Sequence, residues 1–207
     1  IMVRKVTGIK RIKVGHAGTL DPQATGVLVL CTGRATKLIE QLMDHDKEYC
    51  ATLQLGATTP SFDSEHEIDA TYPYEHITEE MVRSALLQFT GEIDQRPPSF
   101  SAVKVGGIRA YDLARQGQEV ELSHKRITIH ELELVSFTPP TLQLRIVCSR
   151  GTYIRSLARD LGTALDSGAY LTKLVRTRSG EISQADCFRL DQMDELLALT
   201  PDEELLS

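Results

Sequence analysis

The residues best suited to chemistry lie in one short segment, which reads GHAGTLDPQATG from Gly15 to Gly26. Its single carboxylate is Asp21, and a carboxylate can attack an electron-poor carbon and later depart. Glycines at positions 15, 18 and 26 let the backbone turn sharply and let a ligand approach closely. The segment therefore predicts a loop that presents Asp21 and His16 to a ligand.

The same residues also allow a purely structural interpretation. Asp21 followed by Pro22 is a good helix start, with the aspartate as N-cap and the proline at the first helical position. His16, taken alone, fits equally well as a loop residue that forms ordinary hydrogen bonds. The residues of this segment leave both interpretations open.

Hydrophobic patterns predict the elements that position this loop. A continuous apolar run bounded by glycines indicates a buried strand over 27–33, and Thr78 is a good N-cap for a helix that ends near Gln88. In the strand over 141–149, every second residue from Leu142 to Cys148 is apolar and shares one face. Helices are predicted over 2–11, 34–45, 78–88, 151–168 and 191–199, and strands over 27–33, 49–56, 126–137, 141–149 and 173–183.

The order of these elements predicts an α+β fold. Strands joined by hairpins and long crossovers favour a mixed, largely antiparallel central sheet flanked by helices. Residues 61–80 are acidic and are expected to form an exposed turn or hairpin. Residues 91–124 depart from the strand and helix rhythm with Pro-Pro, Gly-Gly and a short basic helix, so we expect an insertion that projects from the core.

Composition excludes several classes of protein. The four cysteines are far apart, which argues against a zinc site and a disulfide framework, and Cys31 and Cys148 sit in apolar runs that predict burial. No metal is expected. Apolar runs stay well short of the roughly 20 residues that cross a bilayer, and the first residues lack the apolar core of a signal peptide. We therefore expect a cytoplasmic protein with no membrane association.

The net charge of −6 conceals a strong segregation of charge. Residues 1–40, 96–126 and 145–178 hold 20 of the 23 lysines and arginines and have a combined charge of +13, whereas the remainder carries −19. If these three stretches converge in space, they form a positive surface that favours phosphate backbones. The alternative is that the charges alternate around an ordinary solvated surface.

The segment GHAGTLDPQATGVL closely resembles the signature of the TruB family of tRNA pseudouridine-55 synthases. Three further segments resemble other conserved blocks of that family and occur in the same order, so the resemblance covers nearly the whole chain. They are KEYCATLQLG (47–56), PPSFSAVKVGGIRAYDLARQG (97–117) and CSRGTYIRSLARDLG (148–162). The resemblance implies the pseudouridine synthase fold, with the residues about 91–124 as its thumb-like insertion.

The resemblance also implies a role for each residue at the matching positions. Asp21 corresponds to the catalytic nucleophile, which works without a cofactor or metal, and Arg155 to the arginine paired with it. Tyr49, Tyr153 and Leu174 correspond to residues that line the uracil site. The residue matched by Tyr49 stacks on the base and is a candidate for proton transfer.

The implied substrate is the T-stem-loop of tRNA, in which the target uridine must be extruded before it reacts. His16 corresponds to the residue that helps to hold the disrupted loop. We expect the insertion to grip the RNA and the chain to act as a monomer without an obligate protein partner. The basic residues expected to contact RNA are Arg96, Lys104, Arg109 and Arg115.

Two parts of the family pattern have no counterpart here, namely the N-terminal strand with its K-P-x-G motif and a C-terminal RNA-binding module of the PUA type. Residues 1–207 are therefore expected to form one catalytic domain. One alternative is a guide-RNA-dependent synthase of the same family, which the insertion disfavours because it can grip tRNA without a guide. Another is a tRNA-binding folding chaperone. Whether Asp21 attacks the sugar, attacks the uracil ring or assists elimination stays open.

Overall fold

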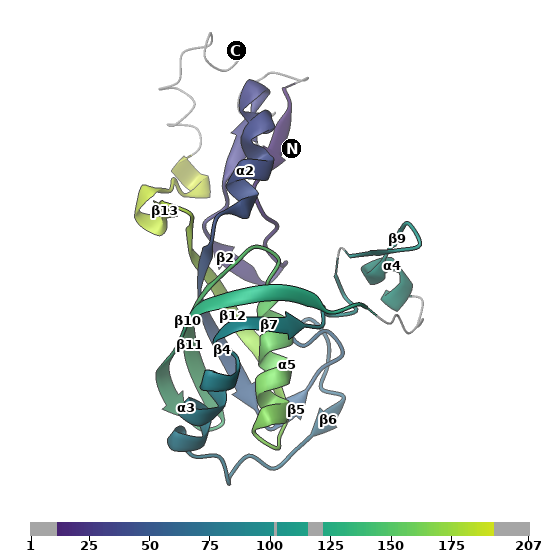
Figure 1. Ribbon diagram of the computed structural model, residues 1–207, viewed down its shortest axis with the longest axis vertical. Helices are drawn as coiled ribbons and strands as arrows, with labels where there is room; N and C mark the ends of the chain where they lie inside the picture. Colours follow the sequence, from purple (N-terminus) through teal and green to yellow (C-terminus); the bar gives the residue numbers. More distant parts are fainter. Residues whose placement is uncertain (1–11, 102, 116–121, 193–207) are drawn as a thin grey trace.

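The computed structural model describes residues 12–101, 103–115 and 122–192 (Figure 1). The predicted helix over 2–11 and most of the one over 191–199 lie outside these residues. Within them, the central sheet has seven strands in the order β13-β12-β4-β11-β10-β7, with β2 added beside β12. The strands are β2 (Ala24–Gly26), β4 (Lys47–Leu55), β7 (Gly91–Gln95), β10 (Lys125–Thr138), β11 (Thr141–Cys148), β12 (Ala169–Ser179) and β13 (Ile182–Ser183).

Neighbouring strands of this sheet are antiparallel except for β2, which runs parallel to β12. The predicted α+β class with a mixed, largely antiparallel sheet is therefore confirmed. The alternation in β11 also holds, because the four predicted inward residues from Leu142 to Cys148 are each at most 1% exposed. Cys31 and Cys148 are buried as predicted, and the four cysteines are free thiols.

Two helices pack on the sheet and on each other. α3 (Glu79–Gln88) contacts β10, and α5 (Ile154–Ala164) contacts β12 and β4. α3 begins as the sequence predicts, because the hydroxyl of Thr78 accepts a hydrogen bond from the Met81 N–H. α5 buries Leu157, Ala158 and Leu161 against the sheet, and truncating a buried leucine in such a core costs about 2–5 kcal/mol. This packing fixes the start of α5 relative to the sheet.

The amino-terminal part differs from the prediction of a strand over 27–33. In this part of the chain, β2 pairs with β12 of the central sheet. The next strand, β3 (Leu30–Thr32), pairs instead with β1 (Val14–His16). Leu28 is 41% exposed, so the apolar run is not a single buried strand. The predicted helix over 34–45 forms as a 3₁₀ turn, η1 (Gly33–Leu38), followed by α2 (Ile39–Asp44).

The insertion stands apart from the sheet in Figure 1 and begins later than predicted. Residues Gly91–Gln95 form β7, an edge strand of the sheet, so the insertion leaves the core after Gln95. It contains β8 (Lys104–Val105), β9 (Ile108–Arg109) and α4 (Ala110–Arg115).

The acidic segment 61–80 includes β6 (Ala70–Thr71), which pairs with β5 (Ala57–Thr58) as a small hairpin. Short 3₁₀ turns, η2 (Gln184–Asp186) and η3 (Leu190–Gln192), follow the sheet. In the part of the chain that is described, none of the helices has the length and apolar character needed to span a membrane.

Candidate active site

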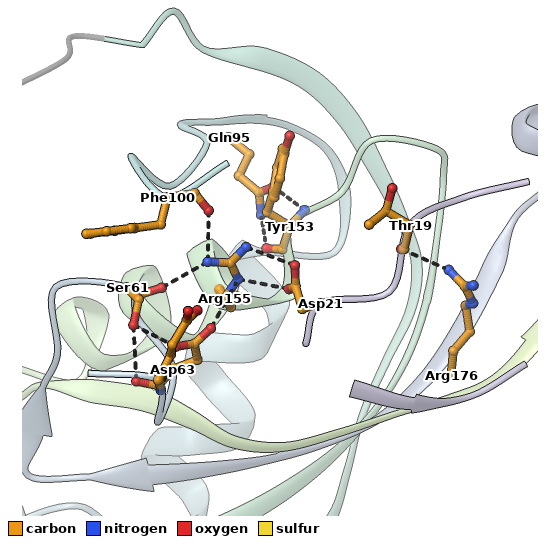
Figure 2. Close-up of polar contacts among 10 residues, drawn as sticks. Thr19, Asp21, Ser61, Asp63, Gln95, Phe100, Tyr153, Arg155 and Arg176 are labelled. Atoms are coloured by element: carbon orange, nitrogen blue, oxygen red, sulfur yellow. Dashed lines mark hydrogen bonds and ion pairs between the residues drawn. The ribbon is translucent and has the colours of Figure 1, made fainter. Parts of the chain in front are cut away.

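Asp21 and Arg155 form a two-pronged ion pair between the amino-terminal loop and α5. Arg155 Nε donates to Asp21 Oδ2 at 2.9 Å, and Nη2 donates to Oδ1 at 3.0 Å (Figure 2). No helix begins at Asp21, because Pro22 and Gln23 form a turn that leads into β2. The N-cap interpretation is therefore wrong, and the carboxylate is held by a guanidinium instead.

The Arg155 side chain is 6% exposed, and the protein satisfies its remaining nitrogen with carbonyls. Nη1 donates to Phe100 O at 3.1 Å and to Ser61 O at 3.3 Å. Arg155 is the second residue of α5, where the helix dipole disfavours a cation, so nearby anions and carbonyls are needed to hold it. The guanidinium is thus fixed on every side before any ligand arrives.

A second carboxylate, Asp63, lies against the same guanidinium. Its Oδ2 is 3.5 Å from Arg155 Nε, and Oδ1 accepts hydrogen bonds from Ser61 Oγ at 2.6 Å and Glu65 N at 3.0 Å. Asp63 is buried, whereas the Asp21 side chain is 35% exposed. Two carboxylates share one cation, and the more accessible of them faces the cavity described next.

A cavity of about 490 Å³ opens in front of this ion pair. Its lining brings together five residues that the sequence analysis singled out, from four different segments of the chain. Such a volume falls in the range of pockets that hold a small ligand, and a single nucleobase is of that kind. The five residues are Asp21 from the loop, Tyr49 from β4, Tyr153 and Arg155 from the start of α5, and Leu174 from β12.

Tyr49 and Tyr153, two tyrosines of the cavity lining, are neutral at physiological pH. Burial raises the pKa of Tyr49 and that of Tyr153 above the ordinary value for a phenol. Each side chain therefore offers an aromatic face and a protonated hydroxyl. A neutral phenol can stack on a base and donate a hydrogen bond, but it does not act as a resting phenolate base.

The loop that carries Asp21 is held from behind by Arg176 of β12. This side chain is 1% exposed, and its guanidinium donates to Val27 O at 2.7 Å, Gly18 O at 3.2 Å and Thr19 O at 3.3 Å. At Gly26 a Cβ would lie 2.1 Å from Arg176 O, so only glycine allows β2 to approach β12 this closely. Buried donors and a close backbone contact together fix the loop.

Three of the residues that build the site were missed from the sequence. Asp63 lies in an acidic stretch that resembles a solvated turn, and Gln95 is one polar residue at the end of a strand. Arg176 left a signal, because it lies two positions after Leu174 in a strand, and residues at this spacing share a face. The side chains of Leu174 and Arg176 are both buried.

The residues predicted to contact RNA lie outside the cavity lining, as far as the described residues show. His16 is exposed on β1, and Arg96 is exposed where the insertion leaves β7. Lys104 and Arg109 are paired positions of the β8–β9 hairpin, and Arg115 is the last residue of α4. These four arginine and lysine positions are therefore on or next to the insertion, and their contact with RNA stays a prediction.

The predicted positive surface is smaller than the charge count suggests. Arg155 and Arg176 are buried, and two further arginines of the third basic stretch are neutralised by neighbouring carboxylates. Lys13, Arg34, Lys37 and Arg96 are exposed and have no ion pair among the described residues, so they remain candidates for an open basic surface. Arg145 contacts Glu48, Glu131 and Glu133, and Arg150 contacts Asp44 and Glu40.

Comparison with known families gives matches along almost the entire chain. Residues 4–154 match the model of the TruB family pseudouridylate synthase N-terminal domain. Residues 155–207 match the model of the tRNA pseudouridylate synthase B C-terminal domain.

Curated relatives are similar over most of their own length. The chain is 60% identical over 200 residues to a tRNA pseudouridine synthase B of Phocaeicola vulgatus, covering 97% of this chain and 85% of that protein. It is 63% identical over 179 residues to one of Bacteroides fragilis, covering 86% and 77%.

Solved structures with a similar fold are longer than this chain. A Cbf5-Nop10-Gar1 complex matches with a TM-score of 0.66 and 29% identity, covering 88% of this chain and 44% of that chain. An archaeal box H/ACA sRNP Nop10-Cbf5 complex matches with a TM-score of 0.68 at 23% identity, covering 99% and 52%, and this likeness supports the fold alone.

Proposed function

Because the chain belongs to the TruB family of pseudouridylate synthases, we propose that it converts the uridine at position 55 in the T-loop of tRNA to pseudouridine. The observation that carries this proposal is the Asp21–Arg155 ion pair at the mouth of a cavity lined by Tyr49, Tyr153 and Leu174. The proposal assigns Asp21 as the catalytic carboxylate and the cavity as the uracil site.

The reaction breaks the bond between N1 of uracil and C1′ of ribose and forms a bond between C5 and C1′. The proton on C5 is lost, and N1 gains one, so the product is an isomer of the substrate. Asp21 can serve by attacking C1′, by attacking C6 of the ring or by assisting elimination, and each route requires an ionised carboxylate. The Arg155 fork holds both oxygens of this carboxylate in a fixed orientation.

The base must leave the RNA stack to reach Asp21, at a cost of a few kcal/mol. The aromatic faces of Tyr49 and Tyr153 can offset part of this cost by stacking on the extruded base. The insertion is then free to hold the surrounding loop through Arg96, Lys104, Arg109 and Arg115. We assign His16, which is exposed on β1, a contact with RNA outside the cavity.

We propose that the chain works as a monomer. We place the reaction in the cytoplasm because tRNA is processed there. Folding chaperone activity on tRNA would require the same RNA contacts but no chemistry at Asp21, and the two functions are separated by testing for the product.

The experiment uses an unmodified tRNA transcript incubated with the full chain. Pseudouridine is then mapped by carbodiimide treatment and reverse transcription, which stops at modified positions. We expect one new stop, at position 55. A transcript in which the uridine at position 55 is replaced by cytidine should give no new stop. Modification at another position would refute the assigned target, and RNA binding without any stop would favour the chaperone.

A further inference from the structure

Gln95, the last residue before the insertion, is hydrogen-bonded to Tyr153 at the start of α5. Tyr153 lies two residues before Arg155. We propose that Gln95 is a positioning residue, whose side-chain amide fixes Tyr153 and, through it, Arg155 for the reaction. This inference rests on the proposed function and concerns a residue outside the cavity lining. Gln95 is the last residue of β7 and is 2% exposed.

The Gln95 amide matches both backbone polar groups of Tyr153. The Tyr153 N–H donates to Gln95 Oε1 at 2.8 Å, and Gln95 Nε2 donates to Tyr153 O at 3.1 Å (Figure 2). Tyr153 is the N-cap residue of α5, and backbone N–H groups at the start of a helix lack partners within it. Two opposed hydrogen bonds fix the position and the direction of this residue more firmly than one.

Neighbouring contacts extend the same attachment along α5. The carbonyl of Arg96 accepts hydrogen bonds from Ser156 Oγ at 2.8 Å and from Arg159 Nη2 at 3.2 Å. The carbonyl of Phe100 accepts from Arg155 Nη1 at 3.1 Å. The root of the insertion and the first turns of α5 are thus held as one unit. Gln95 contributes a side chain to this attachment, which a substitution can remove, whereas Arg96 and Phe100 contribute backbone carbonyls.

The geometry connects this attachment to the chemistry. Tyr153 lines the cavity, and Arg155 follows it by two residues on the first turn of α5. A displacement of reacting groups by about 1 Å can lower a rate 100-fold. Removing the Gln95 amide should therefore act on the reaction step, beyond any effect on folding.

A matched control exists at the other end of the same helix. Ser167 is 8% exposed, and its hydroxyl donates to Pro73 O at 2.8 Å just after α5 ends. This is also a buried bond from a side chain to a backbone group, but it lies far from Asp21 along the helix. Ser167→Ala should lower stability without slowing the reaction.

The test measures the single-turnover rate constant at saturating enzyme, the Kd for the T-stem-loop and the thermal midpoint. Gln95→Met keeps the length of the side chain but removes both hydrogen bonds. We expect its rate constant to fall by about tenfold or more, while Kd stays nearly unchanged. Gln95→Glu retains an acceptor for the Tyr153 N–H and should show a smaller loss of rate, which would mark a partial rescue.

A Gln95→Met rate constant equal to that of the wild type, or a loss confined to Kd, would overturn the inference. A loss of rate in Ser167→Ala as large as in Gln95→Met would also overturn it, because any weakening of α5 would then suffice. If Gln95→Met does not fold, the Gln95→Glu rate constant decides, with a wild-type value counting against the inference and a lower one supporting it. A wild-type chain that forms no pseudouridine would instead overturn the proposed function, and this inference with it.

Discussion

Arg155 reaches both oxygens of Asp21, at 2.9 and 3.0 Å, although 134 positions separate the two residues in the sequence. The same guanidinium also contacts Asp63 and two backbone carbonyls. One buried side chain therefore ties together the amino-terminal loop, the acidic segment, the root of the insertion and α5.

Arg155→Lys should lower the single-turnover rate constant by about 100-fold, because an ammonium cannot provide the fork or reach the carbonyls as well. Kd for the T-stem-loop should change little, since Arg155 faces inward. Rapid-quench kinetics at saturating enzyme measure the rate constant. Arg83→Lys on α3, where the exposed Arg83 pairs with Glu79, is the control and should leave the rate unchanged. A wild-type rate in Arg155→Lys would refute the role of the pair.

Asp63→Asn should lower the free energy of unfolding by about 1.5–3 kcal/mol, because a buried hydrogen-bonded charge beside Arg155 is removed. It should also slow turnover, since Arg155 would lose one of the two anions that hold it. Urea unfolding and single-turnover kinetics check both effects. Asp69→Asn, at an exposed carboxylate bonded to Thr58, should leave stability within about 0.5 kcal/mol. Equal behaviour of the two variants would contradict this role for Asp63.

Arg176→Lys should destabilise the protein by about 1–3 kcal/mol for each buried carbonyl that loses its donor. Lysine has one nitrogen at its tip and cannot reach Val27 O, Gly18 O and Thr19 O together. Hydrogen exchange at residues 18–27 should accelerate more than exchange in α3. If exchange in the loop stays at the wild-type rate, Arg176 does not hold it.

The buried phenol of Tyr49 should make the protein less stable in alkaline solution. Burial raises the pKa of Tyr49 in the folded protein, so the phenol ionises at a lower pH in the unfolded chain. The stability that the neutral phenol contributes below a pH of about 10 is therefore lost as the pH rises through the folded pKa. Tyr49→Phe lacks this group and should lose less stability between pH 8 and pH 11 than the wild type. Urea unfolding at both pH values measures the difference. An identical decline in both proteins would show that Tyr49 does not titrate as proposed.

Local signals predicted much of the fold correctly. Thr78 marks the start of α3, and the alternation from Leu142 to Cys148 marks β11, because capping and period-two burial depend on neighbouring residues. The apolar run at 27–33 was misread as one buried strand, since only Leu30–Thr32 form a strand, which pairs with β1, and β12 pairs with the residues just before the run. The pairing with β12 depends on a strand far away in the sequence.

Sequence patterns also predicted only part of the site. Asp21, Tyr49, Tyr153, Arg155 and Leu174 were singled out through the family resemblance, and the structure brings them to one cavity. The sequence around Asp63 and Gln95 gives no sign of their roles, because each contacts a partner that only folding brings near. Pattern and composition leave such contacts undetermined.

The most direct test of the central claim compares the wild type with Asp21→Asn on an unmodified tRNA transcript that carries tritium at C5 of its uridines. Formation of pseudouridine releases one tritium per target to water. We predict release by the wild type and none by Asp21→Asn, whose RNA affinity, measured by filter binding, should stay close to that of the wild type. Release by Asp21→Asn at the wild-type rate would contradict the account.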